Sequence, residues 1–586
     1  MLRFAVACVA IGLAVPACGG VRGPTRSGPR PNPPPPSASV SLPASPAAAQ
    51  LIQLKVLGIN DFHGQLSSKV FEGRPVGGAA VLASYLRRAA AGMEDRTIIV
   101  HAGDLVGASP LDSSLLKDEP AIQFLNTLAN AACSYDDRTN ADCNVVGTLG
   151  NHEFDEGTTE LLRLVHGGDS AKGPFIERPW RGARFPYVCA NVVDRATRRS
   201  FLPPYVIHRV SGVPVAIVGA TLATTPSIVR APGIAGVEFL DEADAINGAV
   251  HELAAKGVHA IIVAIHDGLT QKSYTGPTDP QAPPPTGAFL SVLARLDDDV
   301  DVVVSGHTHH FTNAMLPNAH GVPILVAQAF AAGTAYDDID LTIDAGTKDV
   351  VAKSARIVTT FADAGVAPDP AVAQIVAKAD EVAAPIGSVV LGESKSRLAR
   401  ERNDAGESPL GDLVADAQRV SVDAAFAFVN PGGIRDDLAA GPVTYGELFA
   451  VQPFGNTVVK IALSGQQIYD LLNQQWGASQ PAGGRMLQVS GLTYTWDSHV
   501  AEGGARVVQV RDSTGAPVVR AKSYAVAVND YMLGGGDNFT VLAQGTNRAP
   551  GPVDVKALAE YVKKLPRPFP APRVGRITKA NTAGAP

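Results

Sequence analysis

The chain has 586 residues, of which 46% are hydrophobic and 18% are charged, a composition typical of globular proteins and unlike that of disordered or fibrous chains. It contains 49 Lys and Arg against 56 Asp and Glu, which gives a net charge of −7, and no basic run interrupts it. This balance argues against a groove that binds the phosphate backbone of a nucleic-acid polymer. Small or neutral partners are expected instead.

The first fifty residues predict export rather than a fold. The apolar run Phe4–Val15 is shorter than the roughly 20 residues of a membrane-spanning helix, so residues 1–18 are typical of a signal peptide. Val15-Pro16-Ala17-Cys18 resembles a bacterial lipobox, in which the cysteine carries lipid. Residues 19–50 are rich in Pro, Ser and Ala and predict a disordered stalk. We expect a cell-surface or periplasmic lipoprotein; ordinary signal cleavage, which would give a secreted soluble protein, is the alternative.

Export also bears on the remaining cysteines. Cys133 and Cys143 flank a polar loop, and in an oxidising compartment we expect them to form a disulfide. Cys189 lies in an apolar segment, which predicts a buried side chain rather than a reactive thiol.

Residues 51–360 predict a layered α/β domain. Short Val- and Ile-rich runs alternate with helix-like segments, and continuous apolar runs indicate strands buried on both faces. The predicted strands are Leu51–Ile59, Thr97–His101, Asn144–Leu149, Val213–Thr221, Val258–His266, Asp301–Ser305 and Pro323–Ala327, and the predicted helices include Gly77–Ala91 and Glu242–Lys256. Ligands bind at the carboxyl ends of strands in such sheets, where the polar motifs of this region lie.

Residues 361–385 predict a linker, with a helix over Asp369–Ala384 that Asp369 caps and Pro385 ends. Residues 386–577 predict a second region that mixes helices and strands, and the last ten residues are expected to be frayed. Its predicted helices are Ser408–Ser421 and Ser464–Trp476, and its predicted strands are Ala425–Asn430, Thr457–Leu463, Leu487–Trp496 and Tyr524–Asn529.

Five strand ends carry side chains that bind metals. The motifs are Asp61-Phe62-His63, Gly103-Asp104, Gly150-Asn151-His152-Glu153-Phe154-Asp155, His266-Asp267 and Gly306-His307-Thr308-His309. Asp-x-His and Gly-Asp are weak signals on their own, whereas the six-residue motif is a strong one. Two divalent ions about 3.5–4 Å apart hydrolyse phosphate esters, because together they activate water and neutralise phosphoryl charge. The motifs predict such a pair, with Asp104 as the bridging carboxylate.

This set of motifs resembles the calcineurin-like metallophosphoesterases and, in its long form, the bacterial 5′-nucleotidase/UDP-sugar hydrolase family. The resemblance implies an N-terminal four-layer α/β domain, a bridging helix and a C-terminal α/β nucleotide-binding domain with a mixed sheet. It also implies ligands for two ions: Asp61, His63, Asp104 and His309 for one, and Asp104, Asn151, His266 and His307 for the other. Such oxygen and imidazole ligands suit Zn²⁺, Mn²⁺, Co²⁺ or Fe²⁺. His152 would contact the phosphoryl oxygens, with Asp155 orienting its ring.

Three motifs in residues 386–577 predict a nucleoside site. They are Asn430-Pro431-Gly432-Gly433-Ile434-Arg435, Pro453-Phe454-Gly455-Asn456 and the segment from Tyr531 to Asp537. Phe454 and Tyr531 are candidates to sandwich a base, which is worth about 1–3 kcal/mol per stacked base, while core packing is the competing explanation. The adjacent glycines favour the sandwich, because they let backbone approach a ligand closely.

The resemblance assigns nucleotide contacts to Asn430, Arg435, Phe454, Asn456, Tyr531 and Asp537. Three departures from the family pattern, Pro431, Tyr531 and Asn538, leave the base preference open. The resemblance also implies a further phosphate-binding arginine in the stretch Ser396–Arg402. Arg400 or Arg402 could supply it, and the sequence does not choose between these and Arg397.

The sequence thus predicts an exported metal-dependent hydrolase of nucleoside 5′-monophosphates, with UDP-sugars as further candidate substrates. One alternative is a 2′,3′-cyclic-nucleotide 2′-phosphodiesterase/3′-nucleotidase. An alternative of another class is a catalytically silent surface lipoprotein that binds a ligand, which the intact Asn151, His152 and Asp155 argue against. The expected partner is a small nucleotide rather than a nucleic-acid polymer, and the oligomeric state is left open.

Overall fold

The computed structural model describes residues 50–580 except residues 72, 171–172, 272–275 and 482. The predicted signal peptide with Cys18, and the predicted stalk up to residue 49, lie outside the described residues.

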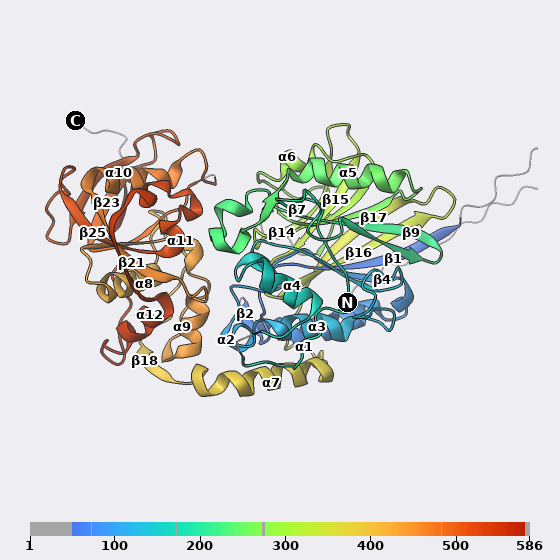
Figure 1. The fold of residues 1–586 in the computed structure, drawn as a ribbon, viewed down its shortest axis with the longest axis horizontal. Coiled ribbons are helices and arrows are strands. Elements are labelled where there is room, and N and C mark those ends of the chain that lie inside the picture. Colours follow the sequence, from blue (N-terminus) through green and yellow to red (C-terminus); the bar gives the residue numbers. More distant parts are fainter. Residues whose placement is uncertain (1–49, 72, 171–172, 272–275, 482, 581–586) are drawn as a thin grey trace, which may run out of the picture. The chain divides into compact units, whose positions relative to one another are not determined.

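The N-terminal domain is built on two sheets (Figure 1). The first has the order β12 (Gly276–Pro277), β17 (Asp349–Thr359), β16 (Ala335–Asp344), β1 (Leu51–Ile59), β4 (Thr97–His101), β5 (Val145–Thr148) and β6 (Tyr187–Val188). The second has the order β14 (Phe311–Pro317), β15 (Pro323–Ala329), β13 (Val300–Val304), β11 (Ala260–His266), β9 (Val213–Thr221) and β8 (Tyr205–Val210). Short pairs join β2 (Lys69–Phe71) to β3 (Arg74–Val76) and β7 (Val192–Asp194) to β10 (Val237–Phe239).

The two sheets and the helices outside them form four layers. Val56 of β1 and Val302 of β13 belong to one buried cluster between the sheets. Helix α1 (Ala79–Ala90) follows the β2–β3 pair, and α2 (Leu111–Ser114), α3 (Glu119–Leu128) and α4 (Thr158–His166) follow β4 and β5 of the first sheet. Helices α5 (Glu242–Ala254) and α6 (Leu290–Leu293) lie along the second sheet (Figure 1). Leu82 of α1 packs with the outer face of the first sheet and Ile246 of α5 with that of the second. The predicted four-layer α/β domain is therefore confirmed.

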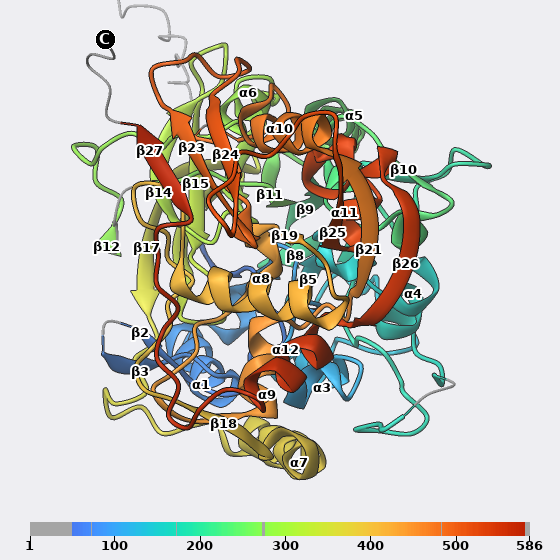
Figure 2. The same ribbon diagram turned by 90° about the vertical axis from the view of Figure 1, so that its left-hand side faces the viewer.

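The C-terminal domain has a mixed five-stranded sheet (Figure 2). Its order is β22 (Gln488–Ser490), β19 (Phe426–Val429), β25 (Ser523–Asn529), β21 (Thr457–Ser464) and β26 (Thr546–Val553), with β19 parallel to β25 and the other neighbours antiparallel. A second sheet joins β24 (Val507–Asp512), β23 (Leu492–Asp497) and β27 (Ile577–Ala580), and β18 (Val390–Ser394) pairs with β20 (Gly441–Thr444). The helices are α8 (Pro409–Ser421), α9 (Tyr445–Val451), α10 (Gly465–Asn473), α11 (Asp530–Leu533) and α12 (Asp554–Val562).

Helix α7 (Pro370–Gly387) connects the two domains and packs on α1, α2 and α3. The Asp369 side chain caps its first turn, accepting the Ala371 and Val372 N–H groups at 3.0 Å each. The sequence placed the end of this helix before Pro385, but the helix continues to Gly387 with Pro385 inside its last turn. Proline lacks the N–H that would bond the carbonyl four residues back, and Pro385 stands only two residues before the end of the helix.

Two other sequence expectations were wrong. The run Leu487–Trp496 forms two strands in different sheets, because the chain turns at Gly491, whose φ is 79°. The last ten residues were expected to be frayed, yet the part of them that the structure describes, Ile577–Ala580, is a strand that pairs in parallel with β23, while residues 581–586 lie outside the described residues.

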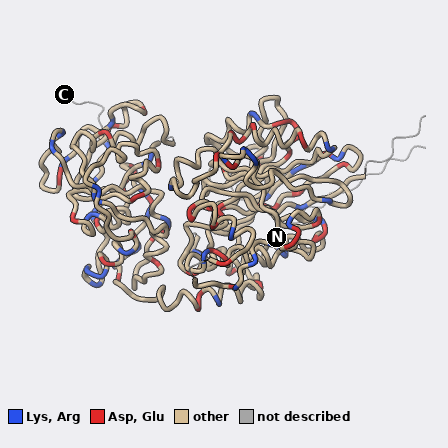
Figure 3. Tube along the Cα trace, in the orientation of Figure 1, with Lys and Arg blue, Asp and Glu red and all other residues tan. Residues whose placement is uncertain are grey.

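Charge and hydropathy agree with the sequence analysis. Acidic and basic residues are interspersed along both domains (Figure 3). Within the part of the chain that the structure describes, no helix has both the length and the apolar character needed to cross a bilayer.

Candidate functional site

The predicted metal ligands follow strands whose carboxyl ends lie at one edge of the N-terminal domain. In the first sheet β1, β4 and β5 are parallel neighbours, and Asp61, Asp104 and Asn151 come within three residues of their ends. In the second sheet β11 and β13 are parallel, His266 is the last residue of β11, and His307 follows β13. The topology therefore brings together side chains as far apart in the sequence as Asp61 and His309.

Five of these residues adopt left-handed backbone, with φ of 47° at Asp61, 49° at His63, 51° at Asp104, 72° at His307 and 55° at His309. Non-glycine residues avoid this region, at a cost of order 1–3 kcal/mol each. Neighbouring turns hold one another in place: the Asp61 N–H donates to the Gly103 carbonyl at 3.1 Å, and the His63 N–H donates to the Asp104 carbonyl at 2.9 Å. The strained turns aim the side chains at a common centre.

A first group of possible ligands comprises Asp61, His63 and His309, whose donor atoms lie within 4.8 Å of one another. His63 Nε2 is 3.1 Å from His309 Nε2, and His309 Nε2 is 3.2 Å from Asp61 Oδ1. Asp104 Oδ2 lies 3.8 Å from His63 Nε2. The structure thus gathers the four residues that the sequence assigned to the first ion.

The residues assigned to the second ion also meet. Asp104 Oδ2 is 3.0 Å from His266 Nε2, and Asn151 Oδ1 is 3.0 Å from His307 Nδ1. The His266 and His307 rings pack edge to face with their centroids 5.3 Å apart. Asp104 adjoins both groups, which is the position that a bridging carboxylate requires.

The hydrogen bonds of the histidines fit metal binding. His63 Nδ1 donates to the Gly107 carbonyl at 2.9 Å, and His266 Nδ1 donates to the Ala102 carbonyl at 2.8 Å, so each ring turns its Nε2 toward the centre. Burial lowers the pKa of His63 well below its usual value, which keeps the ring neutral. His266 Nε2 is buried and faces Asp104 Oδ2 at 3.0 Å. Burial opposes protonation of this ring, but the Asp104 and Asp61 carboxylates raise the pKa of His266 to about 10. Imidazole nitrogens and carboxylate oxygens this close suit a divalent cation.

His152 lies beside the ligand groups with its ring oriented by a carboxylate. Its Nδ1 donates to Asp155 Oδ2 at 2.7 Å, and its backbone N–H donates to Asp104 Oδ1 at 2.8 Å. Burial opposes protonation of the ring, but the Asp155 and Asp104 carboxylates raise the pKa of His152 above its ordinary value. With Nδ1 engaged, Nε2 can donate a hydrogen bond to a ligand.

Glu153 is a positioning residue for which the sequence analysis assigned no role. Its buried carboxylate accepts three backbone N–H groups, from Asp104 at 3.0 Å, Leu105 at 2.9 Å and Gly150 at 2.6 Å. Burial and the Asp104 charge raise the pKa of Glu153 to about 7. The side chain ties the turn after β4 to the turn after β5. Its place inside the six-residue motif was the one signal that could have identified it.

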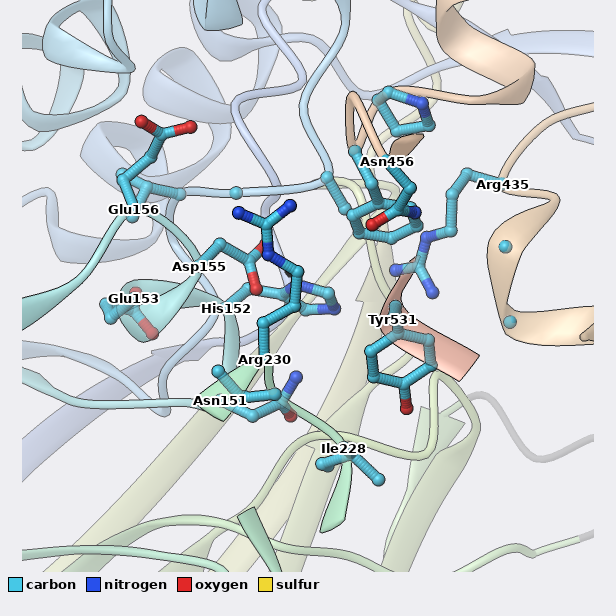
Figure 4. Close-up of a pocket in the computed structure, with 18 of the residues that line it drawn as sticks. Asn151, His152, Glu153, Asp155, Glu156, Ile228, Arg230, Arg435, Asn456 and Tyr531 are labelled. Carbon is cyan, nitrogen blue, oxygen red and sulfur yellow. Dashed lines mark hydrogen bonds and ion pairs between the residues drawn. The ribbon is translucent and has the colours of Figure 1, made fainter. Parts of the chain in front are cut away.

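A cavity of about 310 Å³ joins the edge of the ligand groups to the predicted nucleoside site (Figure 4). From the N-terminal domain, Asn151, His152, Asp155 and His307 line it. From the C-terminal domain, the lining includes Asn430, Arg435, Phe454, Asn456, Tyr531 and Asp537. Figure 4 shows Arg435 and Tyr531 facing the His152 side of this space. Ten of the predicted site residues thus border a single cavity.

The two predicted stacking residues have different surroundings. The Phe454 ring lies nearly parallel to the His152 ring, with centroids 5.6 Å apart and an interplanar angle of 16°. The Tyr531 hydroxyl donates to Asp537 Oδ1 at 2.9 Å and accepts the Asp537 N–H at 3.0 Å. Asn430 Nδ2 also donates to Asp537, at 2.7 Å from Oδ2. A further arginine, Arg485, lines the cavity and was not identified from the sequence.

The candidate phosphate-binding arginines divide between two places. Arg435 Nη2 lies 3.4 Å from His63 Nε2, and its guanidinium lies 5.7 Å from the centre of the Phe454 ring. Arg400 and Arg402 instead line a second cavity of about 190 Å³. Arg397 forms an ion pair with Asp437. The structure therefore brings Arg435 to the main cavity and leaves the other three outside its lining.

Two family models match the chain. The model described as calcineurin-like phosphoesterase matches residues 54–311, and the model described as 5′-nucleotidase, C-terminal domain, matches residues 385–544. The first match covers the part of the N-terminal domain that carries the ligand groups, and the second covers the part of the C-terminal domain that carries the predicted nucleoside site.

Several known proteins resemble the chain over most of its length. "Cell wall protein Lmo0130" of Listeria monocytogenes is 33% identical over 560 residues, covering 88% of this chain and 68% of the relative. "Endonuclease YhcR" of Bacillus subtilis is 35% identical over 548 residues, covering 92% of this chain but 42% of the relative, so the chain spans less than half of that protein. The crystal structure of a 5′-nucleotidase precursor from Thermus thermophilus has a TM-score of 0.75 at 29% identity, covering 90% of this chain and all of the other.

Proposed function

Because this chain belongs to the family of calcineurin-like phosphoesterases that carry a 5′-nucleotidase C-terminal domain, and is therefore a phosphoric monoester hydrolase, we propose that it hydrolyses nucleoside 5′-monophosphates to nucleoside and phosphate. One observation carries the proposal: a single cavity is lined both by His152 beside the metal-ligand groups and by the aromatic and polar residues expected to hold a nucleoside. A phosphate at one end and a base at the other would fill such a space. UDP-sugars are proposed as further substrates.

Two divalent ions would be held by the two ligand groups, with Asp104 shared between them. When bound, they would supply activated water and neutralise charge on the phosphoryl oxygens. His152 Nε2 donates a hydrogen bond to a phosphoryl oxygen as charge accumulates there, and Asp155 holds the proton on Nδ1 so that the ring keeps its orientation. Arg435 binds the phosphate from the opposite wall.

The leaving nucleoside is held by the C-terminal domain. Phe454 and Tyr531 would stack on the base and Asn456 would bind its polar edge. Asp537, whose carboxylate Asn430 holds, would accept a ribose hydroxyl. Arg400 is a second candidate for binding the phosphate. Burial lowers the pKa of Arg435, and the positive charge of nearby Arg400 lowers it further, so the two side chains lie close to each other. None of these roles requires a protein nucleophile.

The proposed activity is tested on the purified protein after its metals have been stripped and then restored with Mn²⁺, Zn²⁺ or Co²⁺. Phosphate release is measured from AMP, UDP-glucose, 2′,3′-cyclic AMP and ATP. We expect metal-dependent release from AMP and a loss of at least about a hundredfold in kcat for His152→Ala, the usual range for removing a group that stabilises a transition state. Preference for the cyclic nucleotide would favour the phosphodiesterase alternative. Absence of phosphate release from all four substrates would refute the proposed enzymatic activity.

We also propose that the protein is exported and held at the membrane by a lipid on Cys18. The disulfide between Cys133 and Cys143 supports an oxidising compartment, where such bonds persist. The Listeria relative, which is named a cell wall protein, is consistent with a surface location.

A further inference from the structure

The Asp537 carboxylate is largely occupied before any substrate binds. Oδ1 accepts from the Tyr531 hydroxyl at 2.9 Å and from Arg485 Nη1, and Oδ2 accepts from Asn430 Nδ2 at 2.7 Å. An ionised carboxylate has about four acceptor sites, so roughly one remains. A ribose presents two neighbouring hydroxyls. Asp537 alone, in this arrangement, can accept a hydrogen bond from only one of them.

Asp537 is also unable to turn easily toward a second hydroxyl. Its backbone is left-handed, with φ of 55°, and its carbonyl accepts Gln480 Nε2 at 2.7 Å. The residue is buried, with 7% of its surface exposed. The Asn430 side chain that holds Oδ2 is itself fixed, because Asn529 Nδ2 donates to Asn430 Oδ1 at 3.1 Å. The carboxylate is therefore held in one orientation from several sides.

Arg485 places hydrogen-bond donors beside the Asp537 carboxylate. Its backbone N–H donates to the Gln475 carbonyl at 2.9 Å, which fixes the start of the side chain, and its guanidinium pairs with Asp537 while 27% of the side chain stays exposed. Arginine has five N–H donors in a planar fork. Among the residues that the structure describes, the guanidinium donates to Asp537 alone, and the side chain lines the main cavity. The other N–H donors of Arg485 can therefore bind a ligand in the cavity.

We propose that Arg485 is a further sugar-binding residue, which together with Asp537 forms a donor and acceptor pair matched to two neighbouring hydroxyls. This inference rests on the proposed function and deepens it. One hydroxyl donates its proton to Asp537 Oδ2, and the oxygen of the other accepts an N–H of Arg485. The substrate class is therefore the ribonucleotide, because a deoxyribonucleotide offers one of these two partners.

Tyr531 connects this sugar site to the base site. Tyr531 is one of the departures from the family pattern noted above, and its hydroxyl bonds Asp537 directly. The ring that would stack on the base is thereby tied to the carboxylate that would bind the sugar (Figure 4 shows the Tyr531 ring). Removing the hydroxyl frees an acceptor site on Oδ1 without removing the ring.

The test compares AMP, 2′-deoxy-AMP and 3′-deoxy-AMP as substrates of the metal-loaded protein. We expect the wild type to show a lower KM for AMP than for either deoxynucleotide. Arg485→Met keeps an apolar stem and removes the donors, so it should raise the KM for AMP about tenfold, the loss expected for one charge-assisted hydrogen bond, with kcat changed less than about threefold. The KM of one deoxynucleotide should stay nearly unchanged, because that substrate lacks the hydroxyl that Arg485 binds.

The matched control is Arg511→Met, which removes a half-buried arginine of the same domain that bonds Gln509 and the Gly515 carbonyl. It should leave all three KM values unchanged. If Arg485→Met fails to fold, Arg485→Lys replaces it, since lysine keeps the charge beside Asp537 but loses the fork of donors. An equal rise in KM for all three substrates, or a wild type with equal KM values, would overturn the proposal.

A separate measurement distinguishes failure of this inference from failure of the proposed function. Binding of adenosine and 2′-deoxyadenosine to the protein is measured by calorimetry, which needs no hydrolysis. Tighter binding of adenosine that Arg485→Met abolishes would support the sugar site even if no phosphate were released from AMP. Phosphate release without any preference for ribose would leave the function standing and refute the sugar site.

Discussion

Two buried aspartates of the N-terminal domain, Asp104 and Asp337, differ in the groups that surround their carboxyls. Asp104 lies against His266 and His152, whose charges hold its pKa well below the usual value despite burial. Asp337 on β16 lies opposite Gly58 of β1, in the core between the sheets, and neither of its side-chain oxygens has a hydrogen-bond partner among the described residues. Burial raises the pKa of Asp337 well above its usual value, so this carboxyl is protonated when the protein is folded.

This difference predicts how stability depends on pH. Because the folded pKa of Asp337 is raised, the native state binds a proton that the unfolded state releases above about pH 4, and stability is lost as the pH rises from there. Asp337→Asn removes the titration, so its free energy of unfolding should fall less between about pH 5 and pH 8 than that of the wild type, by up to about 1.4 kcal/mol per pH unit.

Urea unfolding across this pH range measures the effect, with the exposed aspartate variant Asp404→Asn as the control. Equal pH slopes for the wild type and Asp337→Asn would contradict the expectation.

At the scale of elements, continuous apolar strands were predicted closely and amphipathic ones were missed. The bounds of β1, β4 and β9 agree with the predicted runs, because strands buried on both faces leave an unbroken apolar signal. The sequence analysis did not identify β16 and β17, which alternate buried and exposed residues and carry charges such as Asp338 and Asp340. Their pairing with β1 depends on distant contacts that no local pattern contains.

In the candidate site, too, the residues with a local sequence signal were predicted and those that depend on distant contacts were not. Its predicted ligands stand in short motifs at strand ends, so the sequence could identify them. Glu153 acts on the backbone of three residues in two different turns, and Arg485 meets Asp537 across 52 residues of sequence. Such contacts arise from the fold and could not be derived from spacing.

The start of α7 gives a prediction about an element. Asp369 accepts two backbone N–H groups of the first turn and pairs with Arg87 at 2.8 Å, so Asp369→Ala removes a cap and an ion pair together. We expect the free energy of unfolding to fall by about 1–2 kcal/mol, mostly from the lost cap. The amides of the first turn should exchange faster with deuterium.

The control is Glu381→Ala in the same helix, which is exposed and lies far from the cap. Equal amide exchange in both variants would argue against the capping role.

At the scale of the whole molecule, the proposed membrane anchor is a lipid on Cys18, which stands in the N-terminal segment before the two domains. Two acyl chains on one cysteine suffice for stable anchoring, since each buried methylene contributes about 0.8 kcal/mol. The predicted metal ligands and the predicted nucleoside-binding residues all lie beyond residue 50. Anchoring and catalysis should therefore be separable.

Cys18→Ser tests this separation. We expect the phosphatase activity to move from the membrane fraction of the producing cells to the soluble fraction, with KM and kcat unchanged. Cys8→Ser, a change within the predicted signal peptide, should leave the distribution as it is. Activity that stays in the membrane fraction after Cys18→Ser would argue against the lipid anchor.

The left-handed backbone at Asp61, His63, Asp104, His307 and His309 affects which substitutions stabilise the protein. Glycine would adopt each of these conformations without steric cost, so inactive variants with glycine there can fold as well as the active protein or better. Stability and activity therefore compete at these positions. A screen for heat resistance alone would favour variants with glycine at these positions, which lack the side chains of the site. Selection for turnover would retain those side chains.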